Sequence, residues 1–134
     1  MAPDDPYFPQ PQIDFEGLLN FSELDWFVTN WEELGLPDED LLLLQMRLMA
    51  SPKRGSVVPG TGGLRKLRFS PPAWNRGKSG ALRVCYVYFE KYGFIVLVTV
   101  YAKNEMDNLS SAGIKSIQAA IERIEAALQR RFGF

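Results

Sequence analysis

The stretch LRVCYVYFEKYGFIVLVTVYA, residues 82–102, contains two runs of β-branched and aromatic side chains separated by a short polar segment. Residues 82–89 and 94–102 each have the length and composition typical of a β-strand. The connection, residues 90–93, is short enough for an antiparallel hairpin. The second run is almost continuously apolar, which predicts a central strand that is buried on both faces.

Two helical patterns precede this hairpin. Ser22 and Asp25 resemble a capping box and predict the start of a first helix, which Gly35 ends. A second helix is predicted from Pro37 until just before Pro52, because its leucines recur along one stripe.

Further strands are predicted at residues 64–69 and, as a short segment, at residues 18–21. Residues 107–111 lead into a final helix with an apolar stripe, Ile114, Ile117, Ile121, Ile124 and Leu128. This order predicts a small α+β domain, in which a curved antiparallel sheet packs against two N-terminal helices and one C-terminal helix.

The first 17 residues differ in composition from the rest of the chain. They contain four of the nine prolines and show little periodicity. We therefore predict a proline-rich N-terminal arm at residues 1–17, followed by one folded domain at residues 18–134.

The charges of the chain are strongly segregated. Residues 1–50 contain eleven acids and one base, whereas residues 51–89 contain no acid and eight bases. The bases are Lys53, Arg54, Arg65, Lys66, Arg68, Arg76, Lys78 and Arg83. A basic working surface on an acidic body indicates a partner that carries phosphate.

Composition also excludes several kinds of chemistry. The single cysteine, Cys85, excludes an intramolecular disulfide and is typical of a reducing compartment. Without histidine, zinc sites and His-based acid–base catalysis are excluded, so any catalysis must use Lys, Arg, Tyr or carboxylates. No secretory signal is indicated near Met1, and residues 94–102 are too few to span a bilayer, so we expect a cytoplasmic protein without a membrane partner.

Residues 76–79, RGKS, resemble the end of a phosphate-binding Walker loop. That loop needs a glycine where Pro72 stands, and it needs a helix where a strand is predicted here. We therefore exclude a nucleotide triphosphate site of this kind.

Three strings occur in a fixed order: VVPGTGGLRKLRF (57–69), GKSGALRVCYVYF (77–89) and LVTVYAKNE (97–105). Together they resemble the RelE/HigB-type toxins, which are ribosome-dependent mRNA interferases of type II toxin–antitoxin systems. The resemblance is strongest to the HigB branch and spans roughly residues 22–130. It implies a compact antiparallel sheet with two helices before it and one after it.

The resemblance also implies a function. Such toxins are endoribonucleases that cut mRNA in the ribosomal decoding site, using the 2′-hydroxyl of the RNA as nucleophile, without a metal or other cofactor. The reaction requires a base for the hydroxyl and positive charge for the phosphate. The implied partners are the ribosome with its mRNA and a cognate antitoxin protein of the helix-turn-helix, HigA-like kind.

Carried over by position, the resemblance implies four catalytic residues: Lys66, Arg68, Arg83 and Lys103. Lys66 and Arg68 share one strand parity, so their side chains point to the same face. Arg83 is the expected phosphate clamp, because arginine offers a bidentate fork.

Further RNA contacts are predicted at six positions: Arg65, Arg76, Lys78, Tyr86, Tyr101 and Asn104. Tyr86 and Tyr101 are candidates for stacking on a base, with a place in the core as the alternative. Asn104 stands where some family members have a catalytic arginine, so the group that assists the leaving oxygen is open.

Two other functions fit the same features. A toxin-like fold that has lost catalysis would be a protein- or RNA-binding module, which the departure at Asn104 favours. A plain RNA-binding protein would need only the basic charge.

Overall fold

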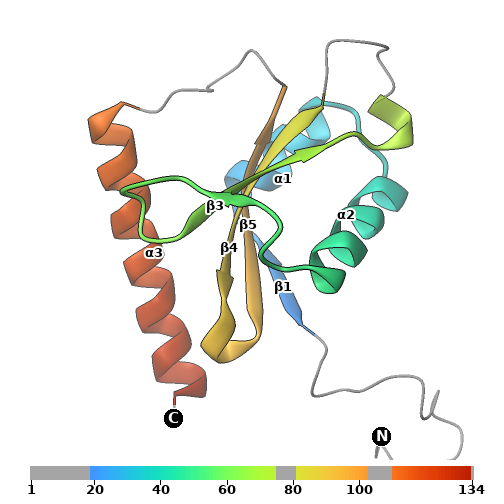
Figure 1. Cartoon of the computed structure of the whole chain (residues 1–134). Coiled ribbons are helices and arrows are strands. Elements are labelled where there is room, and N and C mark those ends of the chain that lie inside the picture. Colours follow the sequence, from blue (N-terminus) through green and yellow to red (C-terminus); the bar gives the residue numbers. More distant parts are fainter. Residues whose placement is uncertain (1–18, 75–80, 103–109, 134) are drawn as a thin grey trace, which may run out of the picture.

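The computed structural model describes residues 19–74, 81–102 and 110–133, and the predicted arm at residues 1–17 lies outside this part. The elements in chain order are β1 (Asn20–Glu23), α1 (Asp25–Glu33), α2 (Asp38–Ala50), β2 (Ser56–Val57), β3 (Leu64–Phe69), the 3₁₀ turn η2 (Pro72–Trp74), β4 (Leu82–Phe89), the 3₁₀ turn η3 (Glu90–Tyr92), β5 (Phe94–Tyr101) and α3 (Ser111–Phe132). Helices α1 and α2 lie on one face of the sheet and α3 lies on the other (Figure 1). The predicted α+β fold is confirmed.

The five strands form one sheet in the order β1-β5-β4-β3-β2. The neighbours β2–β3, β3–β4 and β4–β5 are antiparallel, as predicted, but β1 runs parallel to β5. The predicted antiparallel strands are therefore confirmed, and the parallel pairing of β1 with β5 is a feature that the prediction did not include. Local sequence patterns predict hairpins, because their strands are neighbours in the chain, but they do not predict the direction of such a distant pairing.

Most predicted boundaries agree with the structure, and the exceptions lie near the N-terminal edge. Strands β3 and β4 have the predicted bounds, and β5 ends one residue earlier than predicted. Ser22 lies in β1 and caps no helix; α1 instead follows Leu24, which makes no side-chain cap bond. The two-residue strand β2 was not predicted, because it is too short to show any periodicity.

The sheet separates two apolar clusters. The cluster beneath α1 and α2 includes Phe27, Trp31, Leu44, Leu48 and Tyr86. The cluster beneath α3 includes Leu64, Cys85, Val87, Ile121 and Leu128. Since β5 contributes buried residues to both clusters, the prediction of a strand buried on both faces is confirmed.

Not every large apolar residue is part of this core. Trp31 is buried, but Trp26 is 38% exposed and Leu42 is 57% exposed. Among the described residues, no helix is both long enough and apolar enough to cross a membrane.

The pairing of β4 with β5 is interrupted by a bulge beside the basic residues. Cys85 pairs with Thr99 and Tyr86 pairs with Leu97, so Val98 is an extra residue on β5. A bulge increases the local twist of a strand and redirects the side chains that follow it. Tyr101, the partner of Arg83, follows this bulge.

Candidate functional site

Three cationic side chains gather on one face of β3 and β4. Lys66 lies opposite Cys85, and Arg68 lies directly opposite Arg83. Further along the strands the same face packs against α3 through Leu64 and other apolar side chains. The cations lie beyond this packing, since Lys66 and Arg83 are partly exposed and Arg68 is exposed.

These three cations line an open groove of about 340 Å³ together with the segment 56–59. The lining residues are Ser56, Val57, Val58, Pro59, Lys66, Arg68 and Arg83. No Asp or Glu is among them, so the electrostatic field in the groove is positive. The structure thus brings together three of the four residues predicted to be catalytic.

The facing pair Arg68 and Arg83 destabilises the sheet. Like charges directly opposite each other on neighbouring strands repel, because their Cβ atoms are only about 5 Å apart. Arg83 donates a hydrogen bond to the Ala81 carbonyl at 3.1 Å, and within the described ranges no carboxylate pairs with either arginine. A bound anion would offset this repulsion.

The segment 56–59 forms one wall of the groove, and Tyr86 fixes the chain just before it. Its hydroxyl accepts a hydrogen bond from the Gly55 amide at 2.9 Å and donates one to the Pro52 carbonyl at 2.8 Å. Gly55 is required for this approach, since a Cβ atom there would lie 2.9 Å from the Tyr86 ring. Burial raises the pKa of the Tyr86 hydroxyl, so it stays protonated and able to donate at neutral pH.

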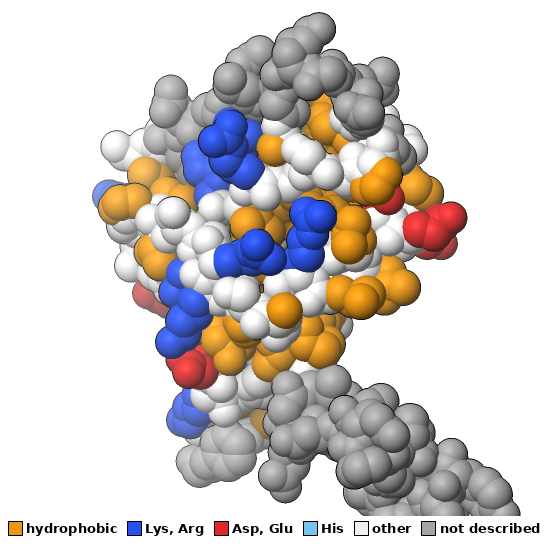
Figure 2. All heavy atoms as spheres, turned by 45° about the vertical axis from the view of Figure 1, so that its right-hand side comes forward, with side chains coloured by type: hydrophobic (Ala, Val, Ile, Leu, Met, Phe, Trp, Pro, Cys, Tyr) orange, Lys and Arg blue, Asp and Glu red, His pale blue; other side chains and the backbone are white. Residues whose placement is uncertain are grey.

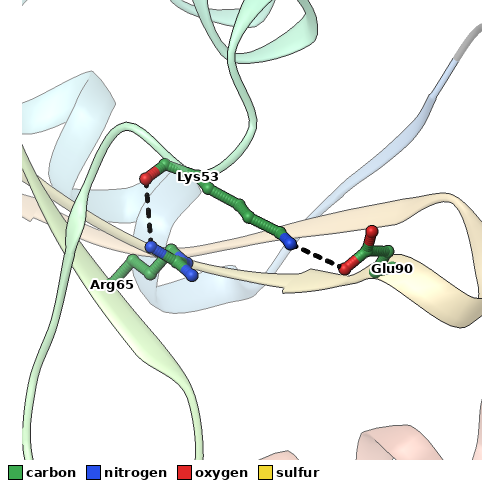
Figure 3. Close-up of polar contacts among 3 residues, drawn as sticks. All are labelled: Lys53, Arg65 and Glu90. Atoms are coloured by element: carbon green, nitrogen blue, oxygen red, sulfur yellow. Dashed lines mark hydrogen bonds and ion pairs between the residues drawn. The ribbon is translucent and has the colours of Figure 1, made fainter.

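Arg65 reinforces the same attachment. Its guanidinium donates hydrogen bonds to the carbonyls of Lys53 at 3.0 Å and Gly55 at 2.7 Å. The Lys53 ammonium reaches away to Glu90 at 3.0 Å (Figure 3). That ion pair is well exposed and contributes little stability.

The chain just after the segment 56–59 is fixed by Thr61, which is fully buried. Its hydroxyl donates to the Val58 carbonyl at 2.7 Å and accepts from the Leu64 amide at 3.0 Å. Gly60 and Gly62, both with positive φ, approach α3 closely enough for a Cβ atom to touch it at 3.5 Å. The wall of the groove is therefore held at both ends.

The structure describes three of the residues predicted to contact RNA, Arg65, Tyr86 and Tyr101. Tyr86 is 0% exposed and Tyr101 is 6% exposed, so neither ring is available to stack on a base, and the alternative of core aromatics is correct. Arg65 donates hydrogen bonds to loop carbonyls and is partly exposed, so its contact with RNA stays a prediction. The close contact of Gly55 with Tyr86 is the feature that sequence reasoning missed.

Cys85 lies beneath the groove. Burial raises the pKa of its thiol from 9.0 to about 11, although the Lys66 ammonium and a hydrogen bond with Tyr101 act in the opposite direction. The side chain is therefore a neutral thiol at physiological pH and is not an activated nucleophile.

The remaining predicted site residues, Arg76, Lys78, Lys103 and Asn104, lie outside the described residues. Lys103 is two positions after Tyr101, the strand partner of Arg83. Within the described part of the chain, no group of three or more Cys, Asp or Glu side chains is arranged to hold a metal ion.

The basic character extends over one face of the molecule. Figure 2 shows several Lys and Arg side chains grouped on this face, with the visible acidic side chains near its margins. Arg47 lies on the other side of the sheet from the groove, because its guanidinium is 5.4 Å from the centre of the Phe69 ring in the cluster beneath α1 and α2.

No family model matches the chain. Among solved structures, a mutant of the Escherichia coli toxin RelE in the free state aligns with a TM-score of 0.51 and 16% sequence identity. The alignment covers 75% of this chain and 98% of that one. The chain has a RelE-like fold. At this identity the comparison establishes the architecture, in agreement with the expected arrangement of helices and sheet.

The facing arginines generate a first prediction about stability. Arg68→Thr removes one of two opposed charges and introduces a residue that favours strands, so the free energy of unfolding should rise by about 0.2–1 kcal/mol. Urea denaturation at low ionic strength measures this change, and added salt should reduce it. Lys53→Thr is the control, because Lys53 has an acidic partner. A clear loss of stability in Arg68→Thr would contradict the electrostatic argument.

A second prediction concerns the hydrogen bonds of Tyr86 that hold the chain before the segment 56–59. Tyr86→Phe leaves the Gly55 amide and the Pro52 carbonyl without their partner, which should lower the free energy of unfolding by about 1–3 kcal/mol. The Gly55 amide should also exchange faster with deuterium. Tyr88→Phe on the same strand is a matched control, since no hydrogen bond to the Tyr88 hydroxyl occurs among the described residues. Equal effects of both substitutions would contradict the assigned role.

A third prediction follows from the raised pKa of Cys85. The folded state keeps the thiol proton to higher pH than the unfolded state does, so stability is lost as pH rises from 9.0 towards about 11. Cys85→Ala should remove a decline of roughly 2–3 kcal/mol across this window. Tyr86, whose pKa is also raised, is present in both proteins and cancels from the comparison. An unchanged pH slope in the variant would disprove the assignment.

Proposed function

We propose that this chain is the toxin of a type II toxin–antitoxin system, a metal-independent endoribonuclease that cuts mRNA on the ribosome. The observation that carries the proposal is the acid-free groove in which Arg68 and Arg83 face each other beside Lys66. The RelE-like fold and the three sequence strings support the same function. The strings favour the HigB branch.

The groove suits the chemistry of RNA cleavage by an internal nucleophile. The 2′-hydroxyl attacks the adjacent phosphorus, the bond to the 5′-oxygen breaks, and a 2′,3′-cyclic phosphate remains. Negative charge accumulates on the phosphoryl oxygens as the new bond forms. Arg68 and Arg83 would stabilise that charge with fixed cations and bidentate hydrogen bonds.

Few residues are candidates for the two proton transfers of the reaction. The base must take the proton of the 2′-hydroxyl, and an acid must supply one to the leaving 5′-oxygen. Lys66 lines the groove beside the two arginines and is one candidate for this role, and Lys103 is the other candidate from the resemblance. Cys85 is not a candidate, because burial keeps it as a neutral thiol.

The proposal includes two kinds of partner. The positive surface of the groove suits the phosphate backbone of ribosome-bound RNA. A cognate antitoxin, of the helix-turn-helix, HigA-like kind, would hold the toxin inactive in the cytoplasm. An acidic segment of the antitoxin would be attracted to the same surface.

The proposal is tested by mapping cleavage of mRNA on translating ribosomes with purified protein. Arg83→Ala should lower the cleavage rate by about 10²-fold or more, since one charge-stabilising donor is lost. Arg83→Lys should recover only part of the rate, because lysine lacks the bidentate fork. Free RNA should remain almost uncut.

The controls separate catalysis from binding. Lys91→Ala, at an exposed position outside the groove, should cut at the wild-type rate. Ribosome affinity of Arg83→Ala should change by less than about tenfold, since one of many phosphate contacts is lost. Metal-dependent cutting of naked RNA would refute the proposed mechanism. A wild-type protein that binds ribosomes but neither cuts mRNA nor arrests growth would instead be a binding module.

A further inference from the structure

Helix α2 is apolar on two sides, but the fold covers only one of them. Leu44 and Leu48 are 0% exposed and belong to the cluster between the sheet and the helices α1 and α2. Leu42 and Met46, on the outer face of the helix, are 57% and 59% exposed. A helix that is apolar all round is normally covered on all sides. The outer face of α2 therefore has the composition of a contact surface.

The exposed side chains of α2 form one patch. Residues four positions apart are neighbours on a helix surface, so Leu42 and Met46 lie side by side. The other exposed large apolar residues of the described ranges, Trp26, Val57 and Phe132, lie on three different elements. Helix α2 lies at the outside of the molecule (Figure 1), and hydrophobic, acidic and basic side chains all reach the surface on that side (Figure 2).

Helix α2 carries opposite charges at its two ends. Asp38 and Glu39 are exposed in its first turn. Arg47 is exposed in its last turn, and the guanidinium of the exposed Arg54 donates a hydrogen bond to the Arg47 carbonyl at 3.5 Å. A complementary partner must therefore place bases against the start of α2, acids against its end and apolar side chains between them.

A second copy of α2 has this pattern when it runs antiparallel to the first. The acidic first turn of each helix then lies against the basic last turn of the other. With the two-fold axis at Leu44, residue 42 of each copy packs against residue 46 of the other, so Leu42 meets Met46 twice. Such an interface uses the same patch on both copies, as a two-fold symmetric contact requires.

We infer that the outer face of α2 is the contact surface of a symmetric, antiparallel dimer of this chain. The helix has 13 residues and is about 20 Å long, so one helix pair buries less than the roughly 1,200 Å² of a stable, specific interface. The dimer is therefore weak and reversible, with a Kd on the order of 0.1 mM.

The dimer leaves the cationic groove open. Lys66, Arg68 and Arg83 lie on the face of the sheet that packs against α3, whereas α2 packs against the other face. Each copy in the dimer keeps an accessible groove. The inference goes beyond the proposed function and does not depend on it.

The inference is tested by sedimentation equilibrium of the full chain without RNA, between about 10 µM and about 1 mM, a range that brackets the expected Kd. The average mass should rise towards that of a dimer as the concentration increases. Added salt should weaken the association, because part of the attraction is between exposed charges. A mass that stays at the monomer value throughout would overturn the inference.

A double variant tests the apolar part of the surface. Leu42→Gln combined with Met46→Gln keeps good helix formers at both positions but removes the apolar patch, so the association should weaken by at least about tenfold. Val57→Thr is the control, because Val57 is 49% exposed on a different element, and it should associate like the wild type. Unchanged association of the double variant would place the contact elsewhere and refute the inference.

Charge reversal tests the antiparallel arrangement. Glu39→Arg alone and Arg54→Glu alone each bring like charges together at both ends of the interface, so each variant should associate more weakly than the wild type at low ionic strength. An equimolar mixture of the two variants should associate more tightly than either one alone, since opposite charges then meet at both ends. A mixture that is no tighter than its components would contradict the arrangement.

Cleavage of mRNA separates this inference from the proposed function. The variant with Leu42→Gln and Met46→Gln should cut at the wild-type rate, because the groove lies on the other face of the sheet. A wild-type protein that forms the dimer but never cuts mRNA would support the inference and refute the proposed function. One that cuts mRNA but stays monomeric at every concentration would do the reverse.

Discussion

The buried hydroxyl of Tyr86 is the constraint on which the groove depends. The ring fills the core between the sheet and the helices α1 and α2, yet its oxygen must find partners because an unpaired buried hydroxyl is costly. It finds them in the Gly55 amide and the Pro52 carbonyl, which draws the chain after α2 against β3. The two-residue strand β2 and the wall of the groove follow from that attachment.

The cations of the groove, unlike Tyr86, lower the stability of the fold. A sheet gains nothing from Arg68 facing Arg83, and neighbouring positions on the same face, such as Leu64 and Val87, are apolar and buried. Functional sites commonly retain features that lower the stability of the fold. Arg68 is exposed and Arg83 is partly exposed, so their charges can remain hydrated.

Much of this architecture was predictable from the sequence, for reasons that are local. The hairpin of β4 and β5 and the helix stripe from Ile114 to Leu128 follow from periodicity, and the shared face of Lys66 and Arg68 follows from strand parity. The parallel pairing of β1, the bulge at Val98 and the burial of Tyr86 depend on residues far apart in the chain. Sequence spacing alone contains no information on such contacts. The sequence therefore predicted the three cations of the candidate groove but not the segment 56–59 that lies beside them.

The openness of the groove bears on why a ribonuclease of the proposed kind would need the ribosome. Fixed cations stabilise the charge of a transition state, but in-line attack by a 2′-hydroxyl also requires a defined backbone conformation of the RNA. Among the described residues, the groove is lined by three cations and by the segment 56–59. On the proposed function, a ribosome that holds the codon would fix the conformation of the RNA, and the open groove would then have to supply only the positive charge.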